Sequence, residues 1–273
     1  MKQGVARIAT AIVGIPLILS SIWFGGWVFY GFISLVALGG VWEMSTMIRK
    51  TGWHSSGIWS VILGALLLLR FIVPYWDALL ILVFMVFLLS TIRLGPGPTI
   101  ERMAGSVLTV VYPVWLFSFF IDIRWEAGLV LGASDAFTLT LMLFCLIWVT
   151  DTGAYYTGKS IGKHKFAPSI SPNKTWEGTI GGLVAAILAA VAFKLFILAF
   201  LTWTDVFALA LLGGFWGQLG DLLESAVKRS ADVKDSGSLL PGHGGVMDRF
   251  DSLIFTAPMY YLYLVHISGL IGG

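Results

Sequence analysis

Two aspartates, Asp221 and Asp248, lie in the most highly charged stretch of the chain. On a helix, Asp221, Ser225 and Lys228 share one face, because positions i, i+4 and i+7 lie close together. Asp221 falls near the expected end of an apolar helix, where a negative charge is unfavourable. A bound cation would stabilise it, and Asp248 would supply a second ligand. Paired carboxylates suit Mg²⁺, which keeps water molecules and takes phosphate oxygens from a substrate.

Two neighbouring carboxylates, Glu224 and Asp251, are further candidate metal ligands. Simpler roles stay open for these side chains. Glu224 lies four residues before Lys228 and can pair with it. Asp248 and Asp251 open a predicted helix, where carboxylates favour the helix dipole. Zinc would require histidine or thiolate ligands, and the single cysteine, Cys145, lies in an apolar run.

A glycine-rich turn, LPGHGG, ends at Gly245 and comes shortly before Asp248. Glycines allow the backbone to approach a ligand closely, so we expect Gly244 and Gly245 to contact substrate. We interpret His243 as a turn residue or a phosphate contact and not as a metal ligand.

A second polar connection contains the run SPNKT from Ser171 to Thr175. Ser171 suits an N-cap and Pro172 suits a first helical position, so the run predicts a helix start. A helix N-terminus binds anions, and Lys174 in its first turn is unfavourable unless an anion lies nearby. We therefore expect Ser171, Asn173 and Lys174 to bind phosphate, with Lys165 from the same basic connection. The simpler explanation is that cytoplasmic loops collect lysines that attract anionic lipids.

Two carboxylates fall inside apolar stretches. Asp151 is expected to face a polar cavity, a cation or a basic partner, because a carboxylate inside a bilayer is costly. For Glu43, near the end of its stretch, we favour an interfacial, snorkelling or arginine-paired side chain over a functional one.

These side chains must be positioned by helices within a membrane. The 273 residues are 58% hydrophobic and 12% charged, whereas soluble domains average about 25% charged residues. About 20 apolar residues cross a bilayer as a helix. The sequence predicts an all-α polytopic membrane protein with about nine spans, the first of them uncleaved. They cover 6–24, 27–48, 57–73, 76–93, 104–121, 136–158, 176–201, 204–228 and 248–270.

Most of the 17 lysine and arginine residues fall on one side of these spans. Such residues are retained on the cytoplasmic side, which predicts a cytoplasmic N-terminus and an outside C-terminus. We expect a single membrane domain, 1–273, with an apolar half, 1–130, and a catalytic half, 131–273. The catalytic half would carry cytoplasmic loops 158–175 and 228–248. A net charge of +2 does not suggest a nucleic-acid partner.

The charged stretch matches S-x-x-K-R-x4-K-D-x-[GSA]-x2-[LIF]-[PGS]-x-H-G-G-x-x-D-R-x-D at every fixed position. The matching residues are Ser225, Lys228, Arg229, Lys234, Asp235, Gly237, Leu240, Pro241, His243, Gly244, Gly245, Asp248, Arg249 and Asp251. In this the sequence resembles the phosphatidate cytidylyltransferase family. The run SPNKTWEG, Ser171 to Gly178, is similar to that family too, whereas the first half resembles it only in hydropathy.

The resemblance implies that CTP and phosphatidic acid react to give CDP-diacylglycerol and pyrophosphate. It implies Mg²⁺ on Asp221 and Asp248, with K⁺ as a second cation. The implied catalytic residues are Asp221, Asp248, Lys228, Arg249 and Lys174. Substrate contacts would come from the two polar connections and the adjoining helices. The implied residues are Asp151, Lys165, Ser171, Asn173, Ser225, Arg229, Lys234, Asp235, His243, Gly244 and Gly245. The enzyme would lie in the cytoplasmic (inner) membrane among membrane lipids, face the cytoplasm and form a homodimer.

The sequence gives weaker support to two other functions. A CDP-alcohol phosphotransferase is suggested by the spacing of Asp248 and Asp251, but Ser252 stands where that motif requires glycine. A transporter would place charges deep inside several spans, and only Lys194 lies near the centre of one. The sequence contains neither a P-loop nor a dinucleotide-binding glycine motif.

Overall fold

A computed structural model describes residues 2–53, 55–91, 99–240, 242 and 244–272. The chain forms two compact units, which we call unit 1 and unit 2. Unit 1 comprises Met1–Ala11, Gly31–Ser118 and Val227–Arg249. Unit 2 comprises Ile12–Tyr30, Phe119–Ala226 and Phe250–Gly273. Several helices continue from one unit into the other, among them α10 (Gly217–Ser230) and α11 (Met247–Leu262).

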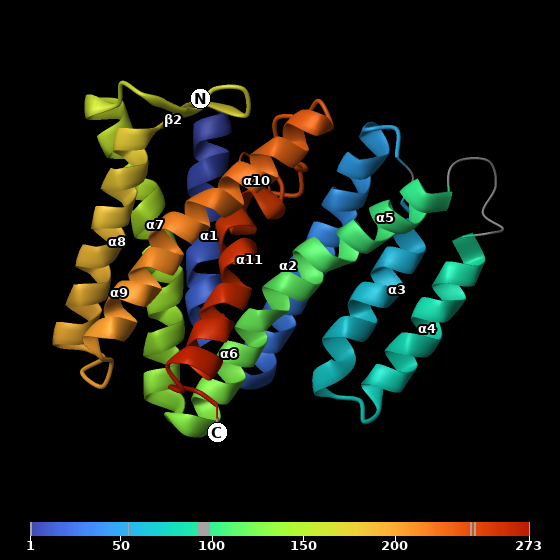
Figure 1. Cartoon of the computed structure of the whole chain (residues 1–273), viewed down its shortest axis with the longest axis horizontal. Coiled ribbons are helices and arrows are strands. Elements are labelled where there is room, and N and C mark those ends of the chain that lie inside the picture. Colours follow the sequence, from blue (N-terminus) through green and yellow to red (C-terminus); the bar gives the residue numbers. More distant parts are fainter. Residues whose placement is uncertain (1, 54, 92–98, 241, 243, 273) are drawn as a thin grey trace. The chain divides into compact units, whose positions relative to one another are not determined.

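Unit 1 contains most of α2 (Gly26–Lys50), and then α3 (Gly57–Leu68), η1 (Leu69–Phe71), α4 (Trp76–Thr91), α5 (Thr99–Val110) and η2 (Val111–Leu116). Helix α3 packs against both α4 and α5 (Figure 1). Ser106 of α5 fixes the start of α3, because its hydroxyl accepts a hydrogen bond from the Ser56 amide at 2.9 Å. The end of α10 and the start of α11 also belong to this unit.

Unit 2 contains most of α1 (Lys2–Phe24), and then α6 (Phe117–Val130), α7 (Ala133–Ile161), α8 (Trp176–Phe196), α9 (Trp203–Leu211), η3 (Leu212–Trp216) and η4 (Tyr263–Ile267). Helices α7 and α8 run side by side (Figure 1). Their close approach depends on glycine: a Cβ atom at Gly182 would lie 2.8 Å from the carbonyl oxygen of Thr150. This pair therefore forms a tight scaffold for the connection that joins it.

Within the part of the chain that the structure describes, five helical stretches are long and apolar enough to cross a membrane: Gly26–Lys50, Thr99–Val130, Ala133–Ile161, Trp176–Phe196 and Trp203–Ser230. Large apolar side chains are exposed, such as Leu35 at 74% and Phe196 at 83%. Lipid is the solvent that makes such exposure favourable. The predicted all-α membrane protein is thus confirmed in its class, while the count of nine spans and the orientation stay predictions.

The predicted helix start at Ser171 is wrong. Ser171–Thr175 forms strand β2, which pairs with β1 (Lys165–Ala167) as an antiparallel hairpin between α7 and α8. Pairing with β1 occupies the backbone of this run, so helix α8 begins only at Trp176. Thr175 is its N-cap, and its hydroxyl accepts a hydrogen bond from the Gly178 amide at 3.1 Å. Lys174 therefore precedes the helix and does not lie in its first turn.

Some predicted element ends also differ. Helix α7 continues to Ile161 and α10 to Ser230, so the two polar connections cover 162–175 and 231–246. Helix α8 ends at Phe196 and not at residue 201. Lys194 consequently lies in its last turn, where its ammonium donates to the carbonyl oxygens of Ala199 and Leu201. Lysine near a helix C-terminus is favourable, which explains its position without a transport path.

Candidate active site

A cavity of about 570 Å³ lies in unit 2 where the β1–β2 hairpin meets α7, α8 and α10. We call it the hairpin cavity. Six predicted site residues line it: Asp151, Lys165, Ser171, Asn173, Lys174 and Asp221. Asp151, which we expected to face a polar cavity, a cation or a basic partner, lines this cavity. Residues from both polar connections or their flanking helices thus meet at one cavity.

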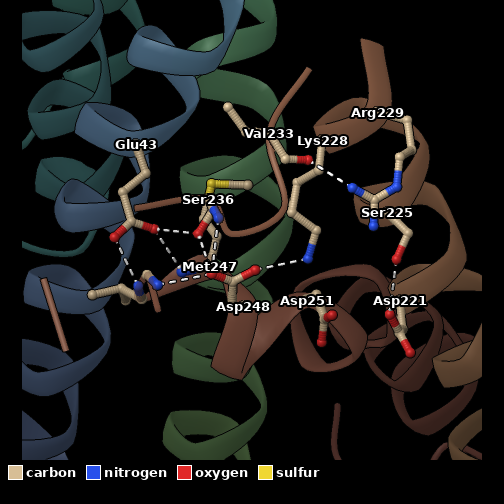
Figure 2. A network of polar contacts seen from close by, with 12 residues as sticks. Glu43, Asp221, Ser225, Lys228, Arg229, Val233, Ser236, Met247, Asp248 and Asp251 are labelled. Carbon is tan, nitrogen blue, oxygen red and sulfur yellow. Dashed lines mark hydrogen bonds and ion pairs between the residues drawn. The ribbon is translucent and has the colours of Figure 1, made fainter. Parts of the chain in front are cut away.

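An ion pair between Lys174 and Asp221 joins β2 to α10. The Lys174 ammonium lies 3.0 Å from Oδ2 of Asp221 and donates to the backbone oxygen of Gln218 at 3.2 Å. Oδ1 of Asp221 accepts a hydrogen bond from the Ser225 hydroxyl at 3.3 Å (Figure 2). The Asp221 side chain is still 36% exposed. Its carboxylate therefore remains accessible to a ligand in the cavity.

The charge of the hairpin cavity suits an anion with a bound cation. Three lysines line it, Lys159, Lys165 and Lys174, together with the carboxylates Asp151 and Asp221. Lys159, at the end of α7, was not predicted as a site residue. Its only sequence signal was its place in a lysine-rich stretch, which does not separate cavity lysines from other surface lysines.

Asp251 of unit 2 interacts with Asp221 and also with Glu224, a third carboxylate. Asp251 shares a side-chain hydrogen bond with Glu224 and lies within electrostatic range of both Glu224 and Asp221. Glu224 is buried. Three hard oxygen donors therefore come from α10 and α11, as Mg²⁺ prefers. Among the residues that the structure describes, however, no group of three or more Asp, Glu, His or Cys is arranged to enclose a metal ion.

A second set of polar contacts, in unit 1, surrounds Asp248 (Figure 2). Its Oδ1 lies 2.7 Å from the ammonium of Lys228. Its Oδ2 accepts hydrogen bonds from the Ser236 amide at 2.8 Å, the Ser236 hydroxyl at 3.0 Å and the Gly245 amide at 2.8 Å. The Asp248 side chain is only 5% exposed. We call Glu43, Lys228, Ser236, Gly245 and Asp248 the loop cluster.

The two predicted aspartates differ in how readily they could hold a metal ion. Oδ2 of Asp248 accepts from two amides and shares the Ser236 hydroxyl with Glu43, and Oδ1 accepts from Lys228. A metal ion at Asp248 would therefore compete with the Lys228 ammonium for Oδ1. Asp221, half-exposed and beside two further carboxylates, fits Mg²⁺ more readily. Substrate phosphates and water would complete the coordination of the ion.

Glu43 of α2 belongs to the loop cluster, and the sequence did not predict this role for it. It is only 2% exposed and accepts hydrogen bonds from the Ser236 hydroxyl and from the Val246 and Met247 amides. The interfacial, snorkelling or arginine-paired side chain that we favoured is therefore wrong. An isolated carboxylate in an apolar stretch was the available signal, but its partners lie 193 to 204 residues away.

The other predicted residues lie at the surface of unit 1. The Arg229 guanidinium donates to the Val233 carbonyl at 2.8 Å and ties down the end of α10. Lys234, Asp235 and Arg249 are exposed. Gly244 adopts a φ of +83°, and a Cβ atom there would lie 2.7 Å from Oδ2 of Asp248. His243 lies outside the described residues.

The chain is similar in sequence to known proteins. Residues 5–267 match the cytidylyltransferase family. A Bacillus subtilis protein named phosphatidate cytidylyltransferase is 40% identical over 220 residues, covering 76% of this chain and 79% of its own. A Staphylococcus haemolyticus protein of the same name is 34% identical over 266 residues, covering 96% and 99%. One from Staphylococcus aureus is 42% identical over 162 residues, or 59% of each chain.

Proposed function

The chain belongs to the cytidylyltransferase family, and from this premise we propose that it transfers the cytidylyl group of CTP to phosphatidic acid. The products are CDP-diacylglycerol and pyrophosphate. The relatives named phosphatidate cytidylyltransferase support this substrate pair. The observation that carries the proposal is the hairpin cavity, where the Lys174–Asp221 ion pair faces a space lined by further lysines. Neither a phosphotransferase nor a transporter receives comparable support.

The reaction needs little proton transfer from the protein. A phosphate oxygen of phosphatidic acid forms a bond to the α-phosphorus of CTP. The bond from that phosphorus to the oxygen bridging to the β-phosphate breaks, and pyrophosphate leaves with the electron pair. Phosphatidic acid is already an anion near neutral pH, so a general base is unnecessary. Positioning and neutralisation of charge are the main contributions left to the protein.

The lysines of the hairpin cavity perform the neutralisation in this proposal. Lys159, Lys165 and Lys174 surround a space that accepts the triphosphate of CTP, and Ser171 and Asn173 donate hydrogen bonds from β2. Lys174 is the central group, because its ammonium already faces a carboxylate and can turn toward a phosphate. Lys228, Arg229 and Arg249 provide further positive charge for the lipid phosphate. Ser225, Lys234, Asp235 and Gly244 are proposed as supporting contacts.

Mg²⁺ would be held by Asp221 with Glu224 and Asp251 as further ligands. The ion supplies charge neutralisation at the reacting phosphate oxygens. Asp248 enters this set only if its pairing with Lys228 opens. K⁺ stays a proposed second cation.

We place the enzyme in the cytoplasmic membrane with nine spans, and its site toward the cytoplasm. The distribution of lysine and arginine supports this orientation. A reporter fused after residue 273 should be active only outside the cytoplasm, and a cytoplasmic reporter would refute the topology. The family resemblance also predicts a homodimer, which the mass of the purified protein in detergent would test.

The direct test incubates purified protein with labelled CTP and phosphatidic acid, with and without Mg²⁺. We expect labelled CDP-diacylglycerol and pyrophosphate in equal amounts, only when Mg²⁺ is present. Diacylglycerol, which lacks the phosphate, serves as the control acceptor and should give no product. If folded protein in mixed micelles of detergent and phosphatidic acid forms no product in the presence of Mg²⁺, the proposed function is refuted.

A further inference from the structure

The carboxylate of Glu43 lies in the interior of unit 1 and points toward the start of α11 (Figure 2). Oε1 accepts a hydrogen bond from the Val246 amide at 2.8 Å. Oε2 accepts from the Met247 amide at 2.9 Å and from the Ser236 hydroxyl at 2.8 Å. A buried carboxylate is stable only when hydrogen bonds replace its lost water. The start of α11 supplies that replacement for Glu43.

Three consecutive amides at this helix start are bound to two carboxylates. The Gly245 amide donates to Asp248, and the Val246 and Met247 amides donate to Glu43. The first amides of a helix have no partner within it, and negative charge there favours the helix dipole. Asp248 caps the helix from within its own first turn, whereas Glu43 caps it from α2. The start of α11 is thereby tied to a residue far away in the sequence.

The Ser236 hydroxyl connects the two carboxylates directly. It lies 2.8 Å from Oε2 of Glu43 and 3.0 Å from Oδ2 of Asp248. A hydroxyl carries one proton, so the two oxygens share a single donor. A displacement of either carboxylate therefore changes the bond to the other. Asp248 in turn accepts a hydrogen bond from the Lys228 ammonium at 2.7 Å. The hydrogen-bond chain that begins at Glu43 therefore ends at Lys228, a group proposed to neutralise phosphate charge.

Glycines in this region leave space for Glu43. A Cβ atom at Gly237 would lie 2.8 Å from the carboxylate carbon of Glu43, and one at Gly245 would lie 2.7 Å from it. Both distances are shorter than side chains tolerate, so each glycine keeps room for this carboxylate. The glycines beside the turn therefore serve the position of Glu43, besides any contact that they make with substrate.

We propose that Glu43 is a positioning residue for cytidylyl transfer: it holds Ser236, Val246 and Met247 in place, and so fixes Asp248 and, through it, the Lys228 ammonium for the reacting phosphates. The inference rests on the proposed function for its kinetic consequence. Its structural part, the capping of α11 by α2, stands independently of the substrate. Glu43 itself contacts no reacting atom.

The experiment compares Glu43→Gln, Glu43→Asp and the matched control Glu101→Gln, a half-buried glutamate of the same unit. Glutamine keeps one accepting oxygen, but the NH2 group that replaces the other cannot accept a hydrogen bond, so one or two of the three hydrogen bonds are lost. We expect kcat to fall about 10- to 100-fold, as for other residues that orient a catalytic group, with the KM for CTP changed less than about threefold. Glu43→Asp keeps both acceptors on a shorter side chain and should recover part of kcat.

Hydrogen exchange gives a second measurement in protein free of substrate and metal. The amides of Gly245, Val246 and Met247 should lose protection in Glu43→Gln, while α3 and α5 keep theirs. The control Glu101→Gln should leave both kinetics and protection unchanged. If Glu43→Gln cannot be obtained folded, Ser236→Ala tests the same connection, because it removes only the shared hydroxyl, and we expect a smaller fall in kcat.

Wild-type kcat and wild-type protection in Glu43→Gln would overturn the proposal. So would a loss of protection throughout unit 1 without recovery by Glu43→Asp, because Glu43 would then serve only general folding. If the wild-type protein forms no CDP-diacylglycerol, the proposed function fails, and the exchange data still decide whether Glu43 holds the start of α11.

Discussion

The hairpin cavity and the loop cluster use the same kinds of side chain in opposite ways. Each contains a lysine–aspartate pair, Lys174–Asp221 in one and Lys228–Asp248 in the other. The Asp221 side chain is 36% exposed, whereas that of Asp248 is 5% exposed. The first pair lines an open space of about 570 Å³. The second is surrounded by backbone amides and the Ser236 hydroxyl.

This difference separates binding groups from supporting groups. A buried carboxylate whose two oxygens both accept from protein donors binds a ligand only in competition with those partners. A carboxylate that faces a cavity exchanges water, which costs much less. We therefore expect ligands to enter at Asp221 and rigidity to come from Asp248. Replacing each aspartate in turn tests this distinction directly.

The largest effects are expected from Asp221→Asn and Asp248→Asn. Both should lower CDP-diacylglycerol formation by about 10²- to 10³-fold at saturating Mg²⁺: Asp221→Asn removes a charge from the proposed metal site, and Asp248→Asn releases Lys228 from its fixed position. Only Asp248→Asn should also reduce stability, by about 3 kcal/mol, because it leaves the buried Lys228 ammonium without its carboxylate. Thermal unfolding in detergent measures this second quantity.

The contrast fails if both variants unfold at the same temperature as the wild-type protein, since Asp248 would then not act as a support. Near-normal turnover by Asp221→Asn would remove Asp221 from the metal site. Asp77→Asn, an exposed aspartate in the first turn of α4, controls for the loss of a carboxylate elsewhere.

Gly245→Ala should come next in size and should affect only the loop cluster. The added methyl group would collide with the Ser236 hydroxyl and the Glu43 carboxylate. Such overpacking costs about 1–3 kcal/mol, so we expect a lower unfolding temperature together with a lower kcat. The KM for CTP should stay close to that of the wild type. Gly52→Ala is not a suitable control, because Gly52 adopts a φ of +86°. Gly31→Ala is suitable, because a Cβ atom there meets no neighbour within 4 Å.

The two regions were predicted from the sequence to different extents. Apolar runs in the sequence predict helices that are long enough to cross a bilayer. A basic connection and a carboxylate near a helix end indicate that Lys174 and Asp221 belong to one site. These patterns are all local in the chain. The β1–β2 hairpin was missed because Ser171 and Pro172 suit a helix start as well as a strand. Pairing with Lys165–Ala167 decided between the two.

The loop cluster depends on contacts that no local pattern contains. Glu43 and Met247 are 204 residues apart in the chain, and only the packing of unit 1 brings them together. The sequence indicated that a carboxylate at residue 43 is costly in an apolar stretch. It did not indicate that three hydrogen bonds compensate that cost. Glycines next to charged residues suggested contact with a substrate, whereas Gly237 and Gly245 also make room for Glu43.

A smaller effect is expected from Lys174→Ala, which changes the hairpin cavity alone. Loss of the ammonium should raise the KM for CTP about tenfold, because a charge-assisted hydrogen bond contributes about 1.5 kcal/mol or more. Lys174→Arg keeps the charge and should lie closer to the wild type. Stability should change little, since the pair is partly exposed. An unchanged dependence on both CTP and phosphatidic acid would exclude Lys174 from the site.

The smallest effect is expected from Lys159→Gln, at the rim of the hairpin cavity. The Lys159 ammonium lies 5.8 Å from the centre of the Tyr155 ring, and the residue is exposed. An exposed charge contributes little, so the KM for CTP should rise only about threefold, or ~0.6 kcal/mol. Salt screens such charges, so wild type and variant should converge at high ionic strength.

Lys163→Gln is the matched control, because Lys163 follows Lys159 by four residues but does not line the cavity. If both variants raise KM equally, the lysines act through their general field and not through the cavity. If only Lys159→Gln does so, and the difference disappears with added salt, the cavity rim takes part in attracting CTP. That result would extend the contrast with the loop cluster, whose buried Lys228–Asp248 pair should respond little to ionic strength.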